Sequence, residues 1–224
     1  MKLALFDLDH TLIPMDSDYA WGQFTVDIGW RDAEAFGRAN DVFYERYKAG
    51  TLDIAEYIRF ATAAIREHGM EKSIAAHADY MGAVVQKSIT QQARDLVQRH
   101  RDAGDVVVIV TATNEFVTRP IAQALGVQEL LATELERGPD GWFTGEIRGE
   151  PNMREGKVRR MQQWLAQHQW DWSDVESTFY SDSTNDIPLL EKVDTPVATN
   201  PDERLRALAA QRGWRILDLF SAQP

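Results

Sequence analysis

The chain has 224 residues, of which 44% are hydrophobic, so it can bury the core of one ordinary domain, with or without a modest insertion. Its formal net charge of −11 argues against nucleic acids and anionic membranes as partners, because their phosphates attract lysine and arginine, but it is compatible with a small phosphorylated substrate at one site. The absence of cysteine excludes disulfide bonds, thiolate catalysis and cysteine-ligated zinc, and it is compatible with the cytoplasm, where we expect the protein to act.

The first predicted element is a short apolar strand at residues 3–6, which is followed at once by two aspartates. Asp7 and Asp9 interrupt the N-terminal apolar run too early for a signal peptide. The longest other apolar run, residues 106–110, is too short to span a membrane. Two like charges at the end of a buried strand need a partner, and we interpret that partner as a divalent cation.

Residues 16–88 contain no convincing strand. Within them, segments 32–50 and 52–69 have helical patterns that each end at a glycine. A simple crossover between parallel strands needs far fewer residues. We therefore predict a small helical domain at 16–88, inserted into a catalytic core made of residues 1–15 and 89–224 and lying over the carboxyl end of the first strand.

The rest of the chain alternates helices and strands. A helix is predicted at 90–104, a strand at 105–113, helices at 115–126 and 156–168, and strands at 177–183, 195–200 and 214–219. Asp140-Gly141 between β-compatible flanks predicts a hairpin at 134–147. This alternation is typical of an α/β fold with a mostly parallel sheet.

Oxygen-bearing side chains follow three of the predicted strands, where open parallel sheets bind their ligands. They are Asp7 and Asp9, the stretch 111–114, and the stretch 182–186. Magnesium prefers oxygen ligands and is often held by a few carboxylates together with a substrate phosphate. A carboxylate can also attack phosphorus, so Asp7 is a candidate nucleophile. Such a transfer needs a cation, a hydroxyl donor and an acid, and Lys157, Thr111 and Asp9 can fill these roles.

Together these motifs resemble, in type and order, the four motifs of the haloacid dehalogenase superfamily. The motifs are DLDHT at 7–11, Thr111, Lys157 and DSTND at 182–186, and the resemblance covers the whole chain. The insertion after the first motif is similar to the helical cap of the phosphoserine phosphatase-like branch, subfamily IB. The resemblance implies a Rossmann-like three-layer αβα core with a parallel sheet and an inserted, C1-type helical cap. It also implies a magnesium-dependent phosphomonoester hydrolase that works through an aspartyl-phosphate intermediate.

The resemblance assigns the metal site to four aspartates. Asp7 is implied to be both the nucleophile and a magnesium ligand. Asp9 is implied to be the general acid and base, and its backbone carbonyl also binds the metal. Asp182 is implied to bind magnesium, and Asp186 to support it.

The resemblance assigns the transferring phosphoryl group to Thr111, Ala112 and Lys157. Thr111 is also a plausible β-branched strand residue, and Thr113 is its rival as the hydroxyl donor. Lys157 is also readable as an exposed helical lysine, but it directly follows Gly156 and precedes the last motif. We expect the nearby arginines 154, 159 and 160 to be solvated charges.

The resemblance implies two contacts from the cap to the substrate. An acidic residue soon after the first motif holds an ammonium group in the resembled phosphatases, and the matching position is Asp16, with Asp18 as a rival. A cap arginine commonly binds the substrate carboxylate, and Arg59 is the candidate by position. Without such an arginine, a phosphorylated amino alcohol such as histidinol phosphate becomes the alternative to phosphoserine. A helix cap is the structural alternative for Asp16.

Two other functional classes stay open at this point. A phosphomutase on the same scaffold returns the phosphoryl group to its product, and a non-catalytic binding module retains only the fold. Intact motifs argue against the binding module, and the similarity to phosphoserine phosphatases favours hydrolysis over mutase activity. We expect a monomer or a homodimer with a small phosphorylated metabolite as its only partner.

Overall fold

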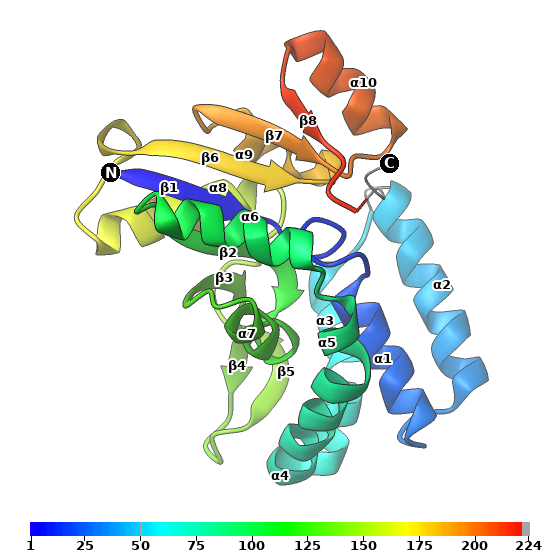
Figure 1. Ribbon diagram of the computed structural model, residues 1–224. Coiled ribbons are helices and arrows are strands. Elements are labelled where there is room, and N and C mark those ends of the chain that lie inside the picture. The colour runs from blue at the N-terminus through cyan, green and yellow to red at the C-terminus, as the bar shows by residue number, and fades with distance from the viewer. Residues whose placement is uncertain (50, 221–224) are drawn as a thin grey trace.

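Six parallel strands form the main sheet in the computed structural model, which describes residues 1–49 and 51–220 (Figure 1). Across the sheet they lie in the order β3 (Glu129–Thr133), β2 (Val106–Asn114), β1 (Lys2–Phe6), β6 (Glu176–Ser181), β7 (Thr195–Thr199) and β8 (Arg215–Leu217). Every neighbouring pair is parallel. The predicted α/β fold is therefore confirmed, and the strand order reverses between β1 and β6, which is where open sheets of this kind bind ligands.

Helices cover both faces of the sheet, because successive side chains of a strand point to opposite sides. Ala4 and Phe6 of β1 pack in one apolar cluster, and Leu3 and Leu5 pack in the other. The first cluster contains side chains of α6 (Gln91–Asp102) and α7 (Glu115–Ala124). The second contains side chains of α8 (Glu155–Gln167), α9 (Ile187–Leu190) and α10 (Glu203–Arg212). The core thus has the three expected αβα layers.

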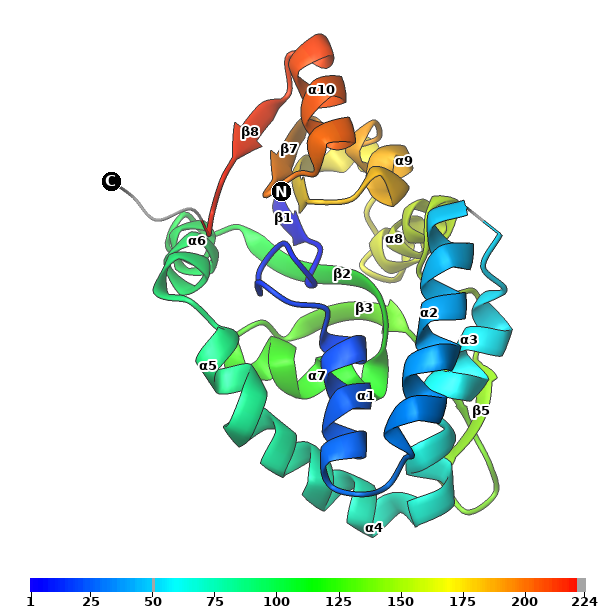
Figure 2. The same cartoon turned by 90° about the vertical axis from the view of Figure 1, so that its right-hand side faces the viewer.

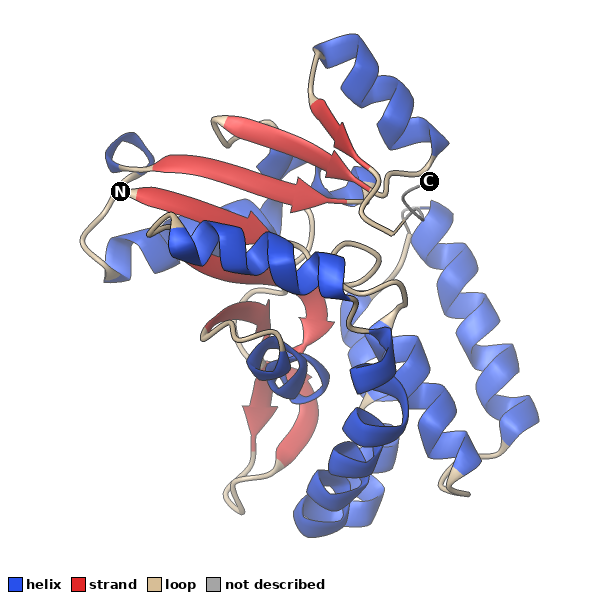
Figure 3. Cartoon of the chain, in the orientation of Figure 1, coloured by secondary structure: helices blue, strands red, loops and turns tan. Residues whose placement is uncertain are grey.

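Residues 16–88 are called the helical segment below, and their described parts, 16–49 and 51–88, lie beyond the carboxyl ends of the strands of the main sheet (Figures 1 and 2). They form α1 (Ser17–Asp27), α2 (Ala33–Ala49), α3 (Ile54–Ala61), α4 (Ala63–Tyr80), a π-helical turn (Met81–Val85) and α5 (Gln86–Ser88). Colouring by secondary structure shows the described part of this segment as helices and loops only (Figure 3). Within the described residues, no helix is both long enough and apolar enough to cross a membrane.

A hairpin joins the core to the helical segment. Strands β4 (Leu135–Arg137) and β5 (Phe143–Ile147) are antiparallel, as predicted, and Gly141 has the positive φ of 77° that the turn requires. Trp142 is buried, and its indole Nε1 donates a hydrogen bond to the Ile65 carbonyl of α4 at 2.9 Å. The hairpin is therefore fixed against the helical segment.

Two local expectations were incomplete. Strand β3 was not predicted, because Glu129, Leu130, Leu131 and Ala132 are good helix formers, and pairing with β2 overrides this local preference. The single helix expected at 52–69 is two helices that meet at Thr62, and the second continues to Tyr80 through a kink at Gly69. The other predicted helices and strands are confirmed to within a few residues.

Candidate active site

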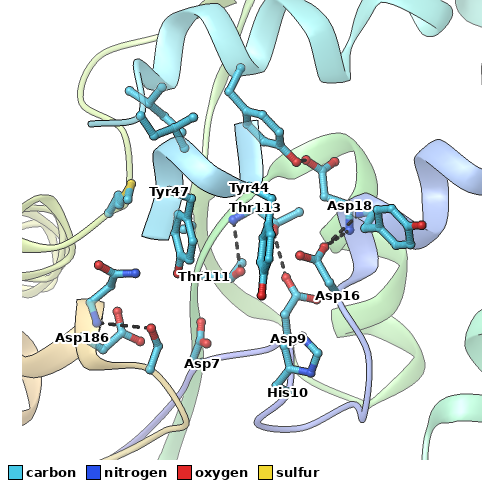
Figure 4. Close-up of a pocket in the computed structure, with 18 of the residues that line it drawn as sticks. Asp7, Asp9, His10, Asp16, Asp18, Tyr44, Tyr47, Thr111, Thr113 and Asp186 are labelled. Carbon is cyan, nitrogen blue, oxygen red and sulfur yellow. Dashed lines mark hydrogen bonds between the residues drawn. The ribbon is translucent and has the colours of Figure 1, made fainter. Parts of the chain in front are cut away.

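A cavity of about 820 Å³ lies between the ends of β1, β2 and β6 on one side and α1, α2 and α3 on the other (Figure 4). Apart from Arg59, the predicted site residues all line it: Asp7, Asp9, Asp16, Thr111, Ala112, Lys157, Asp182 and Asp186. The two rivals, Asp18 and Thr113, also line it. The fold thus brings together side chains that are up to 179 positions apart in the chain, as Asp7 and Asp186 are.

Lys157 is buried between two carboxylates. Its Nζ donates hydrogen bonds to Asp7 Oδ1 at 2.9 Å and to Asp186 Oδ2 at 2.7 Å, and only 2% of the residue is exposed. Burial acts to lower the pKa of Lys157, but the charges of Asp186 and Asp7 outweigh it and hold that pKa above its usual value. The lysine is therefore a fixed positive charge beside Asp7. Asp186 also accepts a hydrogen bond from the Ser181 hydroxyl at 2.7 Å, so its Oδ2 atom positions Lys157.

Close packing explains the glycine before this lysine. A Cβ atom at Gly156 would lie 2.3 Å from the Pro151 carbonyl oxygen, which no side chain tolerates. The same loop is tied to the sheet by Asn152, whose Nδ2 donates to the carbonyls of Thr111 at 2.9 Å and Leu131 at 2.7 Å. Sequence reasoning missed Asn152, because an asparagine after a proline is typical of an exposed turn. It is instead fully buried and holds the start of α8 against β2 and β3.

Asp182 lies close to two other carboxylates, Asp7 and Asp186. Its Oδ1 accepts a hydrogen bond from the Thr11 hydroxyl at 3.0 Å, and burial together with the charges of Asp7 and Asp186 raises its pKa to about 8. Lys157 is already shared by the other two carboxylates. Among the described residues, no group of three or more His, Cys, Asp or Glu side chains is arranged to hold a metal ion by itself. Magnesium is often held by one or two carboxylates with water and a substrate phosphate, and Asp7 with Asp182 fits that donor set.

Asp9 is held by the two sides of the cavity. Its Oδ1 accepts from the Ser17 backbone N–H at 2.8 Å, and its Oδ2 accepts from the Thr113 hydroxyl at 2.8 Å. Burial, with the charge of Asp16, raises the pKa of Asp9 to about 8, so this carboxyl can carry a proton at neutral pH. The Thr113 hydroxyl proton is thus already donated to Asp9. The Thr111 oxygen only accepts, from the Thr113 N–H at 3.2 Å, which leaves its own proton for another acceptor.

The first two acidic residues of the helical segment differ in how they are held. Asp18 is buried, and both its oxygens accept side-chain hydrogen bonds, from Tyr57 at 2.6 Å and from Asn114 at 3.1 Å. Burial raises the pKa of Asp18 to about 6, against the hydrogen bond from Tyr57. Asp16 caps α1 through Oδ1 alone, which accepts from the N–H groups of Asp18 and Tyr19 at 3.0 and 2.9 Å. Asp16 therefore keeps one oxygen for a ligand, and Figure 4 shows it between Asp9 and Asp18.

Two arginines are not where the sequence led us to expect them. Arg59 lies outside the cavity and pairs with Glu146 of β5 at 3.1 Å, so the structure does not bring it to the other site residues. Arg160 is not a solvated charge, because it is only 8% exposed and pairs with Glu134 at 2.7 Å. Both pairings join positions far apart in the chain, which local sequence patterns cannot reveal.

Known proteins resemble this chain over nearly its whole length. The family model for haloacid dehalogenase-like hydrolases matches residues 4–191. A histidinol-phosphatase of Neisseria meningitidis is 40% identical over 97% of this chain and 98% of that protein. The phosphoserine phosphatase SerB1 of Mycobacterium tuberculosis is 35% identical over 98% of this chain and 71% of that protein. A crystal structure of a protein of unknown function from Bordetella pertussis Tohama I has a TM-score of 0.93 at 48% identity, covering 98% of this chain and 99% of that one.

Proposed function

The chain belongs to the haloacid dehalogenase-like hydrolase family and is a phosphatase, and we propose that it is magnesium-dependent, works through an aspartyl phosphate and acts on a phosphorylated amino alcohol. Histidinol phosphate is the first substrate to test, because the relative that is named for it matches over almost its full length. The proposed catalytic domain consists of residues 1–15 and 89–224, with residues 16–88 as its cap.

The proposed reaction uses the two aspartates after β1 in turn. Asp7 attacks phosphorus, the ester bond breaks, and Asp9 gives its proton to the departing oxygen. Asp9 then takes a proton from a water molecule, which attacks phosphorus and releases inorganic phosphate from Asp7. The Asp9 pKa of about 8 supports the first of these roles, and the fixed charge of Lys157 supports the attack by Asp7. A magnesium ion held by Asp7, Asp182 and the Asp9 carbonyl would neutralise charge on the transferred group.

One observation carries the choice of substrate: the described cavity lining from the helical segment is acidic and aromatic, and it contains no arginine or lysine. Its charged members are Asp16, Asp18 and Asp41. The arginines of the lining come from the proposed core: Arg154 directly precedes α8, and Arg204 lies in the first turn of α10. A substrate carboxylate would thus meet negative charge on this side, whereas an ammonium or imidazolium group would be attracted.

We expect L-histidinol phosphate to exceed L-phosphoserine in kcat/KM by at least about tenfold, and Asp16→Asn to reduce the value for histidinol phosphate by roughly 10- to 100-fold. Asparagine can still cap α1 through Oδ1, so only the charge is lost. Hydrolysis of 4-nitrophenyl phosphate should barely change, because this substrate has no cationic group. Steady-state kinetics on the three substrates measures each of these effects.

Asp53→Asn is the matched control for that variant. Asp53 caps α3 through the same pattern of hydrogen bonds, to the N–H groups two and three residues on, but it lies outside the cavity. It should leave all three kcat/KM values unchanged. A preference for phosphoserine in the wild-type enzyme would overturn the proposed substrate class, and equal losses on all three substrates in Asp16→Asn would limit Asp16 to its role as a helix cap.

A second prediction concerns the metal. Saturating magnesium should raise the melting temperature by about 5–10 °C, because a ligand at 100 times its Kd adds about 2.7 kcal/mol to the stability of the folded state. Asp182→Asn should abolish most of this shift, whereas Asp102→Asn, an exposed change on α6, should retain it. Differential scanning fluorimetry with and without chelator measures the effect. An unchanged shift in Asp182→Asn would remove Asp182 from the metal site.

A further inference from the structure

Arg154 has a backbone conformation that normally belongs to glycine. Its φ and ψ are 52° and −125°, and the Gly156 N–H donates to the Met153 carbonyl at 2.8 Å. Residues 153–156 therefore form a type II′ turn with an arginine at the position where glycine is favoured. A side chain with a Cβ atom is strained in this region, and such strain persists mainly where the side chain has a function.

The arginine is not used to make an ion pair with any described residue. Two other arginines on α8 do make such pairs, Arg159 with Glu150 and Arg160 with Glu134. Arg154 instead lines the cavity and donates one hydrogen bond, from Nε to Asn185 Oδ1 at 3.2 Å. The two terminal nitrogens of its guanidinium group therefore remain available to donate hydrogen bonds to a ligand. This is notable because the protein has a formal net charge of −11, so carboxylates that could pair with an arginine are abundant.

The surroundings of Arg154 place it with Lys157. It precedes that lysine by three residues, and its partner Asn185 is next to Asp186, which accepts a hydrogen bond from Lys157. Asp186 and Asp16 lie on opposite sides of Asp7 in Figure 4. Arg154 thus lines the cavity on the side of Asn185 and Asp186, whereas Asp16 lies on the other side of Asp7.

We propose that Arg154 binds the phosphoryl group of the substrate as a second cation beside Lys157. A planar guanidinium group can donate two parallel hydrogen bonds to phosphate oxygens, which a lysine held between two carboxylates cannot do. The hydrogen bond to Asn185 fixes the plane of this group. The proposal rests on the proposed function, because it takes Asp7 as the point to which the phosphoryl group is transferred.

The test is Arg154→Gly, which relieves the turn and removes the cation together. We expect the melting temperature to rise by about 2–4 °C. We expect the Kd for inorganic phosphate, measured by calorimetry with magnesium present, to rise roughly 10- to 100-fold. The kcat/KM values should fall by a similar factor for every phosphate ester, and Arg154→Lys should fall between the glycine variant and the wild type in both measurements.

Gln169→Gly is the matched control. Gln169 follows α8, has a φ of 61° and is exposed, so this variant should gain stability without any change in phosphate binding. An unchanged phosphate Kd in Arg154→Gly would overturn the proposal. A loss of kcat/KM confined to phosphoserine would also overturn it, because Arg154 would then bind the substrate carboxylate and not the phosphoryl group. A wild-type protein that binds phosphate but hydrolyses no ester would overturn the proposed function alone, because the calorimetric comparison does not depend on turnover.

Discussion

Asp7→Asn is expected to lower the turnover of every phosphate ester by roughly 10⁴-fold or more. An amide is a poor nucleophile toward phosphorus, and no other described carboxylate both follows β1 directly and accepts a hydrogen bond from Lys157. The fold should be retained, because an asparagine Oδ1 can still accept that hydrogen bond. Turnover of 4-nitrophenyl phosphate, with circular dichroism and the melting temperature as checks on folding, measures the effect.

A covalent readout separates a lost nucleophile from a lost metal ligand. Beryllium fluoride mimics a phosphoryl group, and we expect it to bind stoichiometrically at Asp7 in the wild-type protein when magnesium is present. Asp182→Asn should weaken this binding, and added magnesium should partly restore it, whereas Asp7→Asn should abolish it at any magnesium concentration. Appreciable turnover in a folded Asp7→Asn variant would contradict the assigned role.

Asp9→Asn should have the next largest effect, and the size of that effect should depend on the leaving group. General acid–base catalysis contributes roughly 10²–10⁴-fold, and an alkyl oxygen needs a proton to depart whereas a 4-nitrophenolate does not. The loss in kcat/KM should therefore approach this range for histidinol phosphate and be clearly smaller for 4-nitrophenyl phosphate. Asparagine can still accept from the Ser17 N–H, so the cavity should keep its shape.

Rapid mixing gives a second measurement on the same variant. If Asp9 also activates the hydrolytic water, Asp9→Asn should release one equivalent of 4-nitrophenol quickly and then turn over slowly. Wild-type enzyme is the control, in which we expect no such burst to dominate. Equal losses on alkyl and aryl esters, with no burst, would count against Asp9 as the acid and base.

Much of the fold could be predicted because the relevant signals are local. The β-branched run before Thr111 and the apolar run before Asp7 are short, continuous and followed by polar residues, which is the pattern of a buried parallel strand. Strand β3 lacks this pattern and owes its conformation to pairing with β2. The helix boundary at Thr62 was missed for a different reason, because the sequence on both sides of it has a helical pattern.

In the candidate site, the residues in local motifs could be predicted from the sequence, and their long-range contacts could not. Asp7, Asp9, Lys157 and Asp182 belong to compact motifs at strand or helix ends, and the cavity lining includes them all. The surroundings that decide their properties are long-range, such as the contact of Asn152 with the ends of two strands. The pairing of an arginine with a glutamate 87 positions away likewise has no local signature, so Arg59 was assigned to the site by its position alone.

The β4–β5 hairpin has a mechanical consequence for the exchange of substrate and product. The helical segment is continuous with the rest of the chain at its two ends, and the Trp142–Ile65 hydrogen bond is one of several contacts that join it to the core in between, together with the Asn114–Asp18 hydrogen bond and the Arg59–Glu146 pair. The Trp142 ring also packs edge-on against Phe116 of α7, with ring centroids 5.8 Å apart. A movement that opens the cavity on the hairpin side would have to break these contacts or carry the hairpin with it. We therefore expect α2, whose Tyr47 faces Ser183 and Asn185 across the cavity, to move more readily than the hairpin side, so that small molecules enter and leave along the edge that α2 covers.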